Sequence, residues 1–159
     1  EFLERLVYGK IGKIHPNGER KCMRIGRSIG RLLGGNIRCL LKLADTEYWP
    51  DFSDSILMLE AYRLTKKDCL KYFKKLNELE VFKRTKGVII GFIYGMQAEN
   101  PTSKQMENLL LEFTKDQNFP ILKVNDFGHE CSNTTLPIGC RVELDSNKKE
   151  ITILEKCVL

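Results

Sequence analysis

Three short apolar runs alternate with two helix-like segments in the middle of the chain. The runs occupy residues 56–59, 88–93 and 121–124, the last interrupted by Lys123, and short runs this rich in apolar residues are typical of strands buried on both faces. The segments between them repeat apolar residues at the spacing of a helix. A strand–helix–strand–helix–strand order favours parallel strands joined by right-handed crossovers. We therefore expect an α/β fold with a small parallel βαβαβ core.

Polar residues predict where the two helices begin. Thr65, with Asp68 three residues later, has the pattern of a capping box, so the first helix is expected to open at Thr65. Thr102, with Gln105 three residues later, gives the same signal for the second helix. The apolar stripe expected to bury the second helix consists of Met106, Leu109, Leu110 and Phe113.

The N-terminal part of the chain has a less regular pattern. Residues 1–20 contain three glycines and a proline, and we interpret them as a linker or arm. Residues 22–33 are expected to form strand structure bent at Gly26 and Gly30. A short helix is expected after Asn36, because apolar residues then recur at helical spacing.

The C-terminal part predicts an antiparallel hairpin. Segments 139–144 and 151–154 are strand-like, and they flank a cluster of turn residues at 145–148. The α/β core is thus expected to carry added β-hairpin structure at both ends. We expect the folded domain to span residues 21–159.

Composition and charge narrow the range of functions. The 159 residues are 42% hydrophobic and 30% charged, as is usual for a folded domain, and no run approaches the roughly 20 apolar residues of a membrane-spanning helix. The net charge is +5, and residues 1–43 alone carry ten basic and three acidic side chains. These basic residues are not interleaved with aromatic ones, and no nucleic-acid-binding motif is present. We therefore expect no membrane and no nucleic-acid binding, and interpret the basic strip as solvated surface or a face turned toward another domain.

The six cysteines stand apart, and no pair has the Cys-x-x-Cys spacing of a zinc or redox site. His129 and Cys131 are two residues apart, but two potential ligands do not make a zinc site. We expect no metal and no cofactor. Scattered cysteines suit a reducing compartment, so a cytoplasmic location is expected.

A Gly-x-Ser-x-Gly pattern surrounds Ser28, from Gly26 to Gly30. In α/β-hydrolases this pattern places a nucleophilic serine on a sharp turn between a strand and a helix. Here Gly34 and Gly35 follow within a few residues and make a poor helix start. Ser28 is thus a candidate nucleophile, and a glycine-bent strand is the more ordinary interpretation.

Two further candidates stand after predicted strands. Glu60 ends the apolar run 56–59, and His129 follows the run 121–124. Open α/β sheets bind ligands at the C-terminal ends of their parallel strands. If the first and third strands lie near each other, Glu60 can fix one imidazole nitrogen and leave the other as a general base. A strand-end salt bridge and a loop histidine without a task are the alternatives.

Five ordered blocks carry a family resemblance. They are 30–36 (GRLLGGN), 48–52 (YWPDF), 56–60 (ILMLE), 127–129 (FGH) and 135–139 (TLPIG). Over about residues 22–158, their order and spacing resemble the C-terminal domain of the LD-carboxypeptidase and microcin C immunity family of serine peptidases. Several ordered blocks are more specific than any single motif.

The resemblance implies a two-domain enzyme and a swivelling β/β/α-like fold for this domain. In the family, an N-terminal domain brings the nucleophilic serine, and the C-terminal domain brings a glutamate and a histidine. The glutamate and histidine correspond to Glu60 and His129, and the serine domain is absent from this chain, which displaces Ser28 as nucleophile. Asn36 is implied as a substrate-pocket residue, with a helix cap as the equal alternative.

The resemblance also implies hydrolysis of an amide bond. The family cleaves the L–D bond of murein tetrapeptide during cell-wall recycling, or a microcin C-type peptidyl nucleotide in self-immunity. The expected partners are the missing N-terminal domain and a peptide or peptidyl-nucleotide substrate, with a homodimer left open, and the chain alone is expected to be inactive. Segment 61–63 departs from the acidic residues that often follow the family glutamate, which leaves the substrate open. The rival class is a non-catalytic binding module with a vestigial Glu–His pair.

Overall fold

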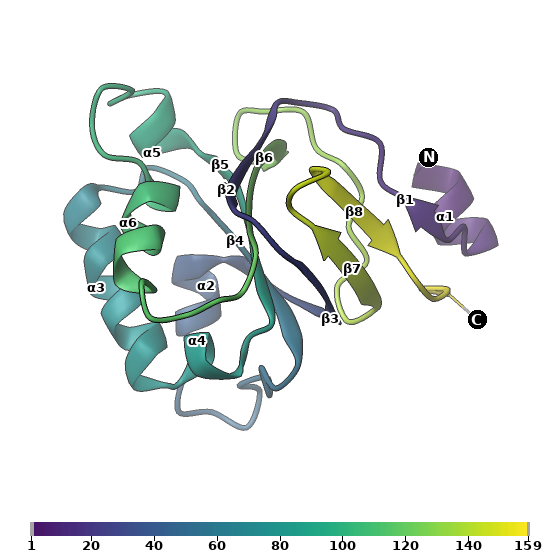
Figure 1. Cartoon of the computed structure of the whole chain (residues 1–159), viewed down its shortest axis with the longest axis horizontal. Helices are drawn as coiled ribbons and strands as arrows, with labels where there is room; N and C mark the ends of the chain where they lie inside the picture. Colours follow the sequence, from purple (N-terminus) through teal and green to yellow (C-terminus); the bar gives the residue numbers. More distant parts are fainter. Residues whose placement is uncertain (1, 159) are drawn as a thin grey trace.

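Four neighbouring strands form the parallel centre of an eight-stranded sheet (Figure 1). The computed structural model describes residues 2–158. Within it, β3 pairs with β4, β4 with β5, and β5 with β6, all in parallel. The expected α/β class is confirmed, and the parallel centre has one strand more than the predicted core. These strands are β3 Arg27–Asn36, β4 Ser55–Ala61, β5 Gly87–Ile93 and β6 Ile121–Gly128.

Shorter antiparallel strands extend the sheet on both sides. On one side, β7 Arg141–Asp145 pairs with β3, β8 Glu150–Ile153 pairs with β7, and β1 Gly12–Lys13 pairs with β8. On the other side, β2 Arg20–Arg24 pairs with β6. β7 and β8 form the predicted C-terminal hairpin. β1 and β2 do not pair with each other but lie at opposite edges of the sheet.

The short connection between β1 and β2 requires the sheet to curl. Seven gaps between eight flat strands would separate the edge strands by about 34 Å. The seven Cα–Cα steps from Lys13 to Arg20 reach at most about 25 Å. The curl brings the β7–β8 turn to β2, where Arg20 Nη1 donates to the Lys149 carbonyl at 3.0 Å.

Helices cover the face of the sheet that points away from the curl (Figure 1). They supply most of the larger apolar cluster, in which Phe73 and Phe82 pack edge to face. Residues 1–20, expected to be a linker or arm, contain the further helix α1 Phe2–Tyr8 and the strand β1. No helix within residues 2–158 has the length and apolar character needed to span a bilayer. The covering helices are α2 Ile37–Leu41, α3 Lys66–Glu78, α4 Val81–Arg84, α5 Tyr94–Gln97 and α6 Met106–Phe113.

Residues of β4 alternate between two apolar clusters. Leu57 and Leu59 belong to the cluster under the helices, whereas Ile56 and Met58 belong to a second cluster inside the curl. Both faces of β4 are therefore covered, which explains its uninterrupted apolar run. The same alternation places Glu60 inside the curl, on the face that Met58 occupies.

The start of α3 agrees with its capping box, whereas the start of α6 does not. Thr65 Oγ1 accepts from the Asp68 amide at 3.1 Å, and α3 begins at the next residue. The prediction that Thr102 opens the second helix is wrong, because α6 begins at Met106. Gln105 donates its side-chain amide to the carbonyls of Met96 in α5 and Ser103 in the following loop, so it ties that loop to α5 and does not complete a capping box.

Candidate active site

Glu60 and Asn36 lie side by side at the C-terminal ends of two parallel strands. Asn36, the last residue of β3, is the register partner of Glu60 in β4. β6 continues to Gly128, so His129 follows directly at the end of a third strand. Because parallel strands end at the same edge of a sheet, the three residues share that edge.

Glu60 and His129 are in direct contact. Glu60 Oε2 lies 2.8 Å from His129 Nδ1, and the Glu60 side chain is 11% exposed while that of His129 is 47% exposed. An ionised carboxylate only accepts hydrogen bonds, so Nδ1 carries the proton in this pair and Nε2 has a free lone pair when the ring is neutral. The geometry thus presents an imidazole nitrogen oriented as a base, with its partner mostly shielded from water.

A glycine in the intervening strand makes room for Phe127, two residues before His129. β5 lies between β4 and β6, so the backbones of the two residues are separated by about two strand spacings, or ~10 Å. At Gly91 of β5, an added Cβ would overlap the ring and the carbonyl oxygen of Phe127. The missing side chain lets Phe127 pack across β5.

A tyrosine ring borders the imidazole, and a second tyrosine packs on the first. The Tyr62 ring centroid lies 5.0 Å from that of His129 and 5.2 Å from that of Tyr94, each with an interplanar angle of 32°. The Arg63 guanidinium lies 5.2 Å from the centroid of the Tyr62 ring. Aromatic contacts of this kind restrict ring rotation, so Tyr62 orients the His129 side chain from the side.

The pair opens onto a cavity of about 280 Å³. Asn36 lines this cavity, and its Oδ1 also accepts from the amides of Arg38 and Cys39 at the start of α2. Asn36 therefore caps a helix and forms part of the cavity wall at once. The lining residues are Gly35, Asn36, Met58, Glu60, Phe127, Gly128, His129 and Asn133.

Ser28 lies at the other end of the sheet. It occupies the second position of β3, eight residues before Asn36, which places it about 26 Å from the Glu60 end of that strand. The strand runs on through Gly30 to Asn36, without the sharp turn and helix that a nucleophile elbow needs. Ser28 cannot reach His129, and the glycine-rich strand is the correct interpretation.

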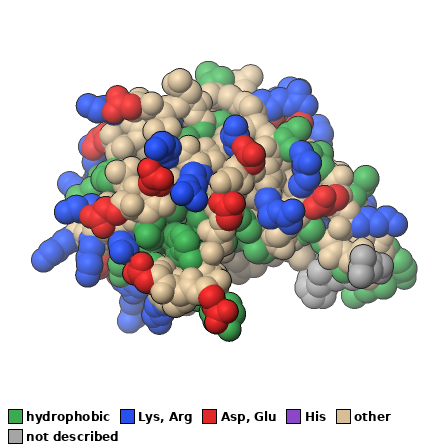
Figure 2. Space-filling model, turned by 90° about the horizontal axis from the view of Figure 1, so that it is seen from below, with side chains coloured by type: hydrophobic (Ala, Val, Ile, Leu, Met, Phe, Trp, Pro, Cys, Tyr) green, Lys and Arg blue, Asp and Glu red, His purple; other side chains and the backbone are tan. Residues whose placement is uncertain are grey.

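A larger hollow of about 580 Å³ lies at that same end, and it contains neither Glu60 nor His129. Arg27 there pairs with Glu143 at 2.6 Å, and Lys86 with Asp54 at 3.2 Å. Figure 2 shows the face seen from below, where acidic and basic side chains are interspersed. Because Glu60 and His129 line the smaller cavity, we place the candidate active site there.

Metal-ligating side chains do not gather at the site. Within residues 2–158, no group of three His, Cys, Asp or Glu side chains is arranged to hold a metal ion. Cys131, two residues beyond His129, is a free thiol, and burial raises its pKa above the usual value for cysteine. A raised thiol pKa opposes the thiolate that a metal would need.

The sequence pattern missed the residues that orient the imidazole. Tyr62 stands two residues after Glu60, just past the end of β4. The two-residue period of an extended chain could have predicted that both side chains point to the same side. Tyr94 begins α5, and its contact with Tyr62 depends on how the chain turns after β5. Gly91 had no signal of its own, because its role depends on the position of Phe127.

The fold and site define an α/β domain that presents a carboxylate–imidazole pair at the ends of its parallel strands. Residues 29–144 match the family model of the LD-carboxypeptidase C-terminal domain. The chain therefore belongs to the LD-carboxypeptidase family, as its C-terminal domain.

Sequence relatives agree with this family. The chain is 26% identical over 132 residues to the Microcin C7 self-immunity protein MccF of Escherichia coli, covering 82% of this chain and 38% of MccF. It is 28% identical over 145 residues to YocD of Bacillus subtilis, which has a provisional carboxypeptidase name, covering 89% of this chain and 44% of YocD. The chain spans less than half the length of these relatives.

Solved structures share the fold. A structure of MccF in complex with glutamyl sulfamoyl guanosine superposes with a TM-score of 0.81 at 24% identity, over 89% of this chain and 42% of that chain. An MccF-like protein from Bacillus anthracis superposes with a TM-score of 0.75 at 29% identity, over 89% of this chain and 44% of that chain.

Proposed function

We propose that this domain supplies the glutamate and the histidine of a Ser–Glu–His triad in a serine-type LD-carboxypeptidase. The observation that carries the proposal is the 2.8 Å contact between Glu60 Oε2 and His129 Nδ1, beside an open cavity at the strand ends. A serine from an N-terminal domain would complete the triad. The length of the relatives supports this arrangement.

In this mechanism His129 Nε2 takes the proton of the serine hydroxyl while the serine oxygen attacks the amide carbonyl carbon. The carbon–nitrogen bond then breaks, and Nε2 delivers the proton to the leaving amine. Water repeats the sequence on the acyl-serine and restores the enzyme. Glu60 keeps the proton on Nδ1 and stabilises the imidazolium that forms between the two proton transfers. The cavity beside Asn36 would take part of the substrate.

Two substrate classes fit the proposal. One is the L–D amide bond of a murein tetrapeptide, as the family resemblance implies; the name LD-carboxypeptidase agrees with cleavage of an L–D bond. The other is a microcin C-type peptidyl nucleotide, because MccF has been crystallised with aspartyl sulfamoyl adenosine and glutamyl sulfamoyl guanosine. We place the reaction in the cytoplasm, since the cysteines at all six positions are free and suit a reducing compartment.

The test compares the amidase activity of this 159-residue chain with that of the full-length protein. The full-length protein is the one that also carries the proposed serine domain. Both substrate classes are assayed. We expect activity on one of them from the full-length protein and none from the 159-residue chain. Activity in the chain that is lost in Ser28→Ala would contradict the proposal. An upstream region without a nucleophilic serine would instead support the non-catalytic binding module.

A further inference from the structure

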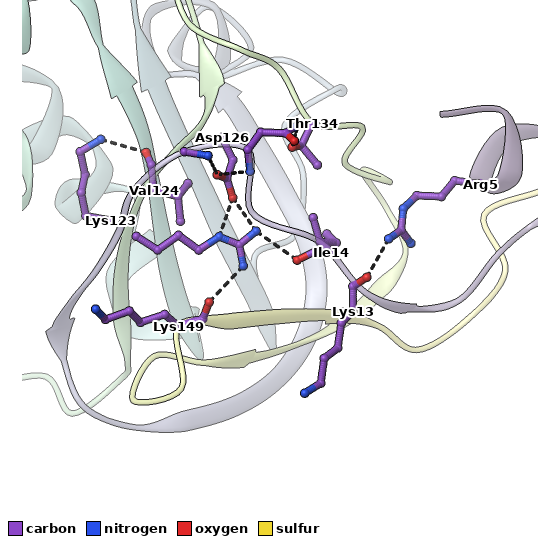
Figure 3. Close-up of polar contacts among 11 residues, drawn as sticks. Arg5, Lys13, Ile14, Lys123, Val124, Asp126, Thr134 and Lys149 are labelled. Carbon is purple, nitrogen blue, oxygen red and sulfur yellow. Dashed lines mark hydrogen bonds and ion pairs between the residues drawn. The ribbon is translucent and has the colours of Figure 1, made fainter. Parts of the chain in front are cut away.

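The segment that crosses between the sheet edges also reaches the loop that carries His129. Residues 14–20 run from β1 to β2 and pass β6 at Asn125 and Asp126, three to four residues before the histidine (Figure 3). At Gly18, a Cβ would lie 2.6 Å from the Asn125 carbonyl oxygen, so only glycine permits this approach. The Asn125 amide also donates to the Glu19 carbonyl at 2.9 Å.

A buried ion pair fixes the crossing segment to β6. The side chains of Arg20 and Asp126 are 3% and 2% exposed, and Arg20 Nε donates to Asp126 Oδ2 at 2.6 Å. The other carboxylate oxygen accepts from the amides of Asn17 at 3.1 Å and Gly18 at 2.9 Å. The remaining guanidinium nitrogens donate to the carbonyls of Lys149 and Ile14, so the buried charges are well supplied with partners.

The same segment also holds the far end of the histidine loop. The Thr134 amide donates to the Asp126 carbonyl at 2.7 Å, which closes the loop that begins after Gly128. Asn17 Nδ2 donates to Thr134 Oγ1, also at 2.7 Å, and so joins the crossing segment to this closure. In Figure 3, Thr134 lies beside Asp126.

Hydrogen bonds, and not apolar burial, hold this loop. Between Phe127 and Thr134 no side chain is buried, and His129 itself is 47% exposed. Inside the loop, the Gly128 amide donates to Asn133 Oδ1 at 3.0 Å. A loop without an apolar anchor depends on the closure at its base for the position of its side chains.

We infer that Asn17 and Thr134 are positioning residues for His129: Thr134 at the base of the histidine loop, and Asn17 in the crossing segment, which is remote in sequence. The inference rests on the proposed function, because it explains how His129, the proposed general base, is held in position. The Asn17–Thr134 hydrogen bond holds the loop closed, and the closed loop keeps Nδ1 against Glu60. Arg20 and Asp126 form the rigid support on which this closure is built.

The first measurement uses the 159-residue chain and needs no activity. Nitrogen-15 NMR follows the Nδ1–H proton of His129, with the Asn118→Ala variant as a matched control, since Asn118 is exposed at the opposite end of the sheet. Asn17→Ala is expected to speed exchange of that proton about fivefold, as the loss of one hydrogen bond would. Thr134→Val is expected to act in the same way, and Thr134→Ser to restore the wild-type rate because it keeps the hydroxyl.

The second measurement compares kcat and KM in the full-length protein. Asn17→Ala and Thr134→Val are expected to lower kcat about 10-fold or more and to leave KM within twofold, because they misplace the base and not the substrate. Exchange and kcat within twofold of wild type in both variants would overturn the inference, as would equal damage from Thr134→Ser. If the unsubstituted full-length protein lacks amidase activity, the proposed function fails, and the exchange measurement still decides the positioning role.

Discussion

The Tyr62 and His129 rings lie in contact, with centroids 5.0 Å apart and planes inclined by 32°. Glu60 holds the imidazole at Nδ1, and Tyr62 borders one side of the same ring. A hydrogen bond at one atom leaves the ring free to rock about it, whereas a ring contact restricts that motion. The carboxylate and the phenol ring together define the direction in which Nε2 points.

Removing the Tyr62 ring should therefore lower turnover. An aromatic contact contributes about 0.5–1.5 kcal/mol, so Tyr62→Leu in the full-length protein is expected to lower kcat by about 3- to 10-fold. Tyr62→Phe keeps the ring and is expected to retain most of the activity. Steady-state amide hydrolysis measures both variants. Equal losses in Tyr62→Leu and Tyr62→Phe would assign the effect to the hydroxyl and not to the ring contact.

The two glycines before Asn36 should differ in how much they tolerate a side chain. Both have left-handed φ angles, +127° at Gly34 and +136° at Gly35, but only at Gly34 would a Cβ collide with the Met58 carbonyl. Gly35→Ala is expected to cost about 1–2 kcal/mol of unfolding free energy, from backbone strain alone. Gly34→Ala is expected to cost at least about 2 kcal/mol more. Urea denaturation measures both, and equal costs would contradict this steric account.

Lys123 should make stability depend on pH. Its ammonium group is buried and donates to the carbonyls of Gly91 and Val124 at 2.7 and 2.9 Å, and burial lowers its pKa from 10.5 to about 8. Between pH 8 and 10.5 the unfolded chain binds a proton that the folded chain has released, so stability rises with pH across this window, by about 3 kcal/mol. Below pH 8 the full cost of burying the charge is present.

Denaturant unfolding at several pH values tests this dependence. The unsubstituted chain should gain stability from pH 8 to 10.5 relative to Lys123→Met, which has no titrating group at this position. Lys123→Met should be less stable than the unsubstituted chain at every pH if the hydrogen bonds of the ammonium group to the carbonyls outweigh the cost of burying its charge. Even then, the free energy of unfolding of Lys123→Met should rise less steeply with pH. Parallel slopes for the two proteins would show that Lys123 does not titrate in this range.

Local signals in the sequence predicted the core elements well. Thr65 and Asp68 are neighbours along the chain, so their capping interaction is encoded within four residues. The apolar run 56–59 predicted a strand covered on both faces, as β4 is. At Thr102 the local pattern misled, because Gln105 donates to carbonyls of α5 and of the loop before α6.

Features that depend on contacts between distant segments could not be predicted locally. β2 pairs with β6 and not with β1, so this pairing depends on the arrangement of the whole sheet and not on neighbouring sequence. The sequence placed Glu60 and His129 at strand ends, but it gave no sign that Gly91 leaves space for Phe127 beside His129. The Asn17–Thr134 hydrogen bond joins residues 117 positions apart and has no sequence signature.

The rate of amide hydrolysis by the full-length protein with Glu60 or His129 substituted tests the central claim most directly. His129→Gln removes the base, and Glu60→Gln removes the charge that fixes its tautomer, so each is expected to lower kcat by about 10³-fold or more. Because the two residues act as a unit, the double variant should be no more than a few-fold worse than the more damaging single one. Activity of either single variant within tenfold of the unsubstituted enzyme, with the fold intact, would contradict the account.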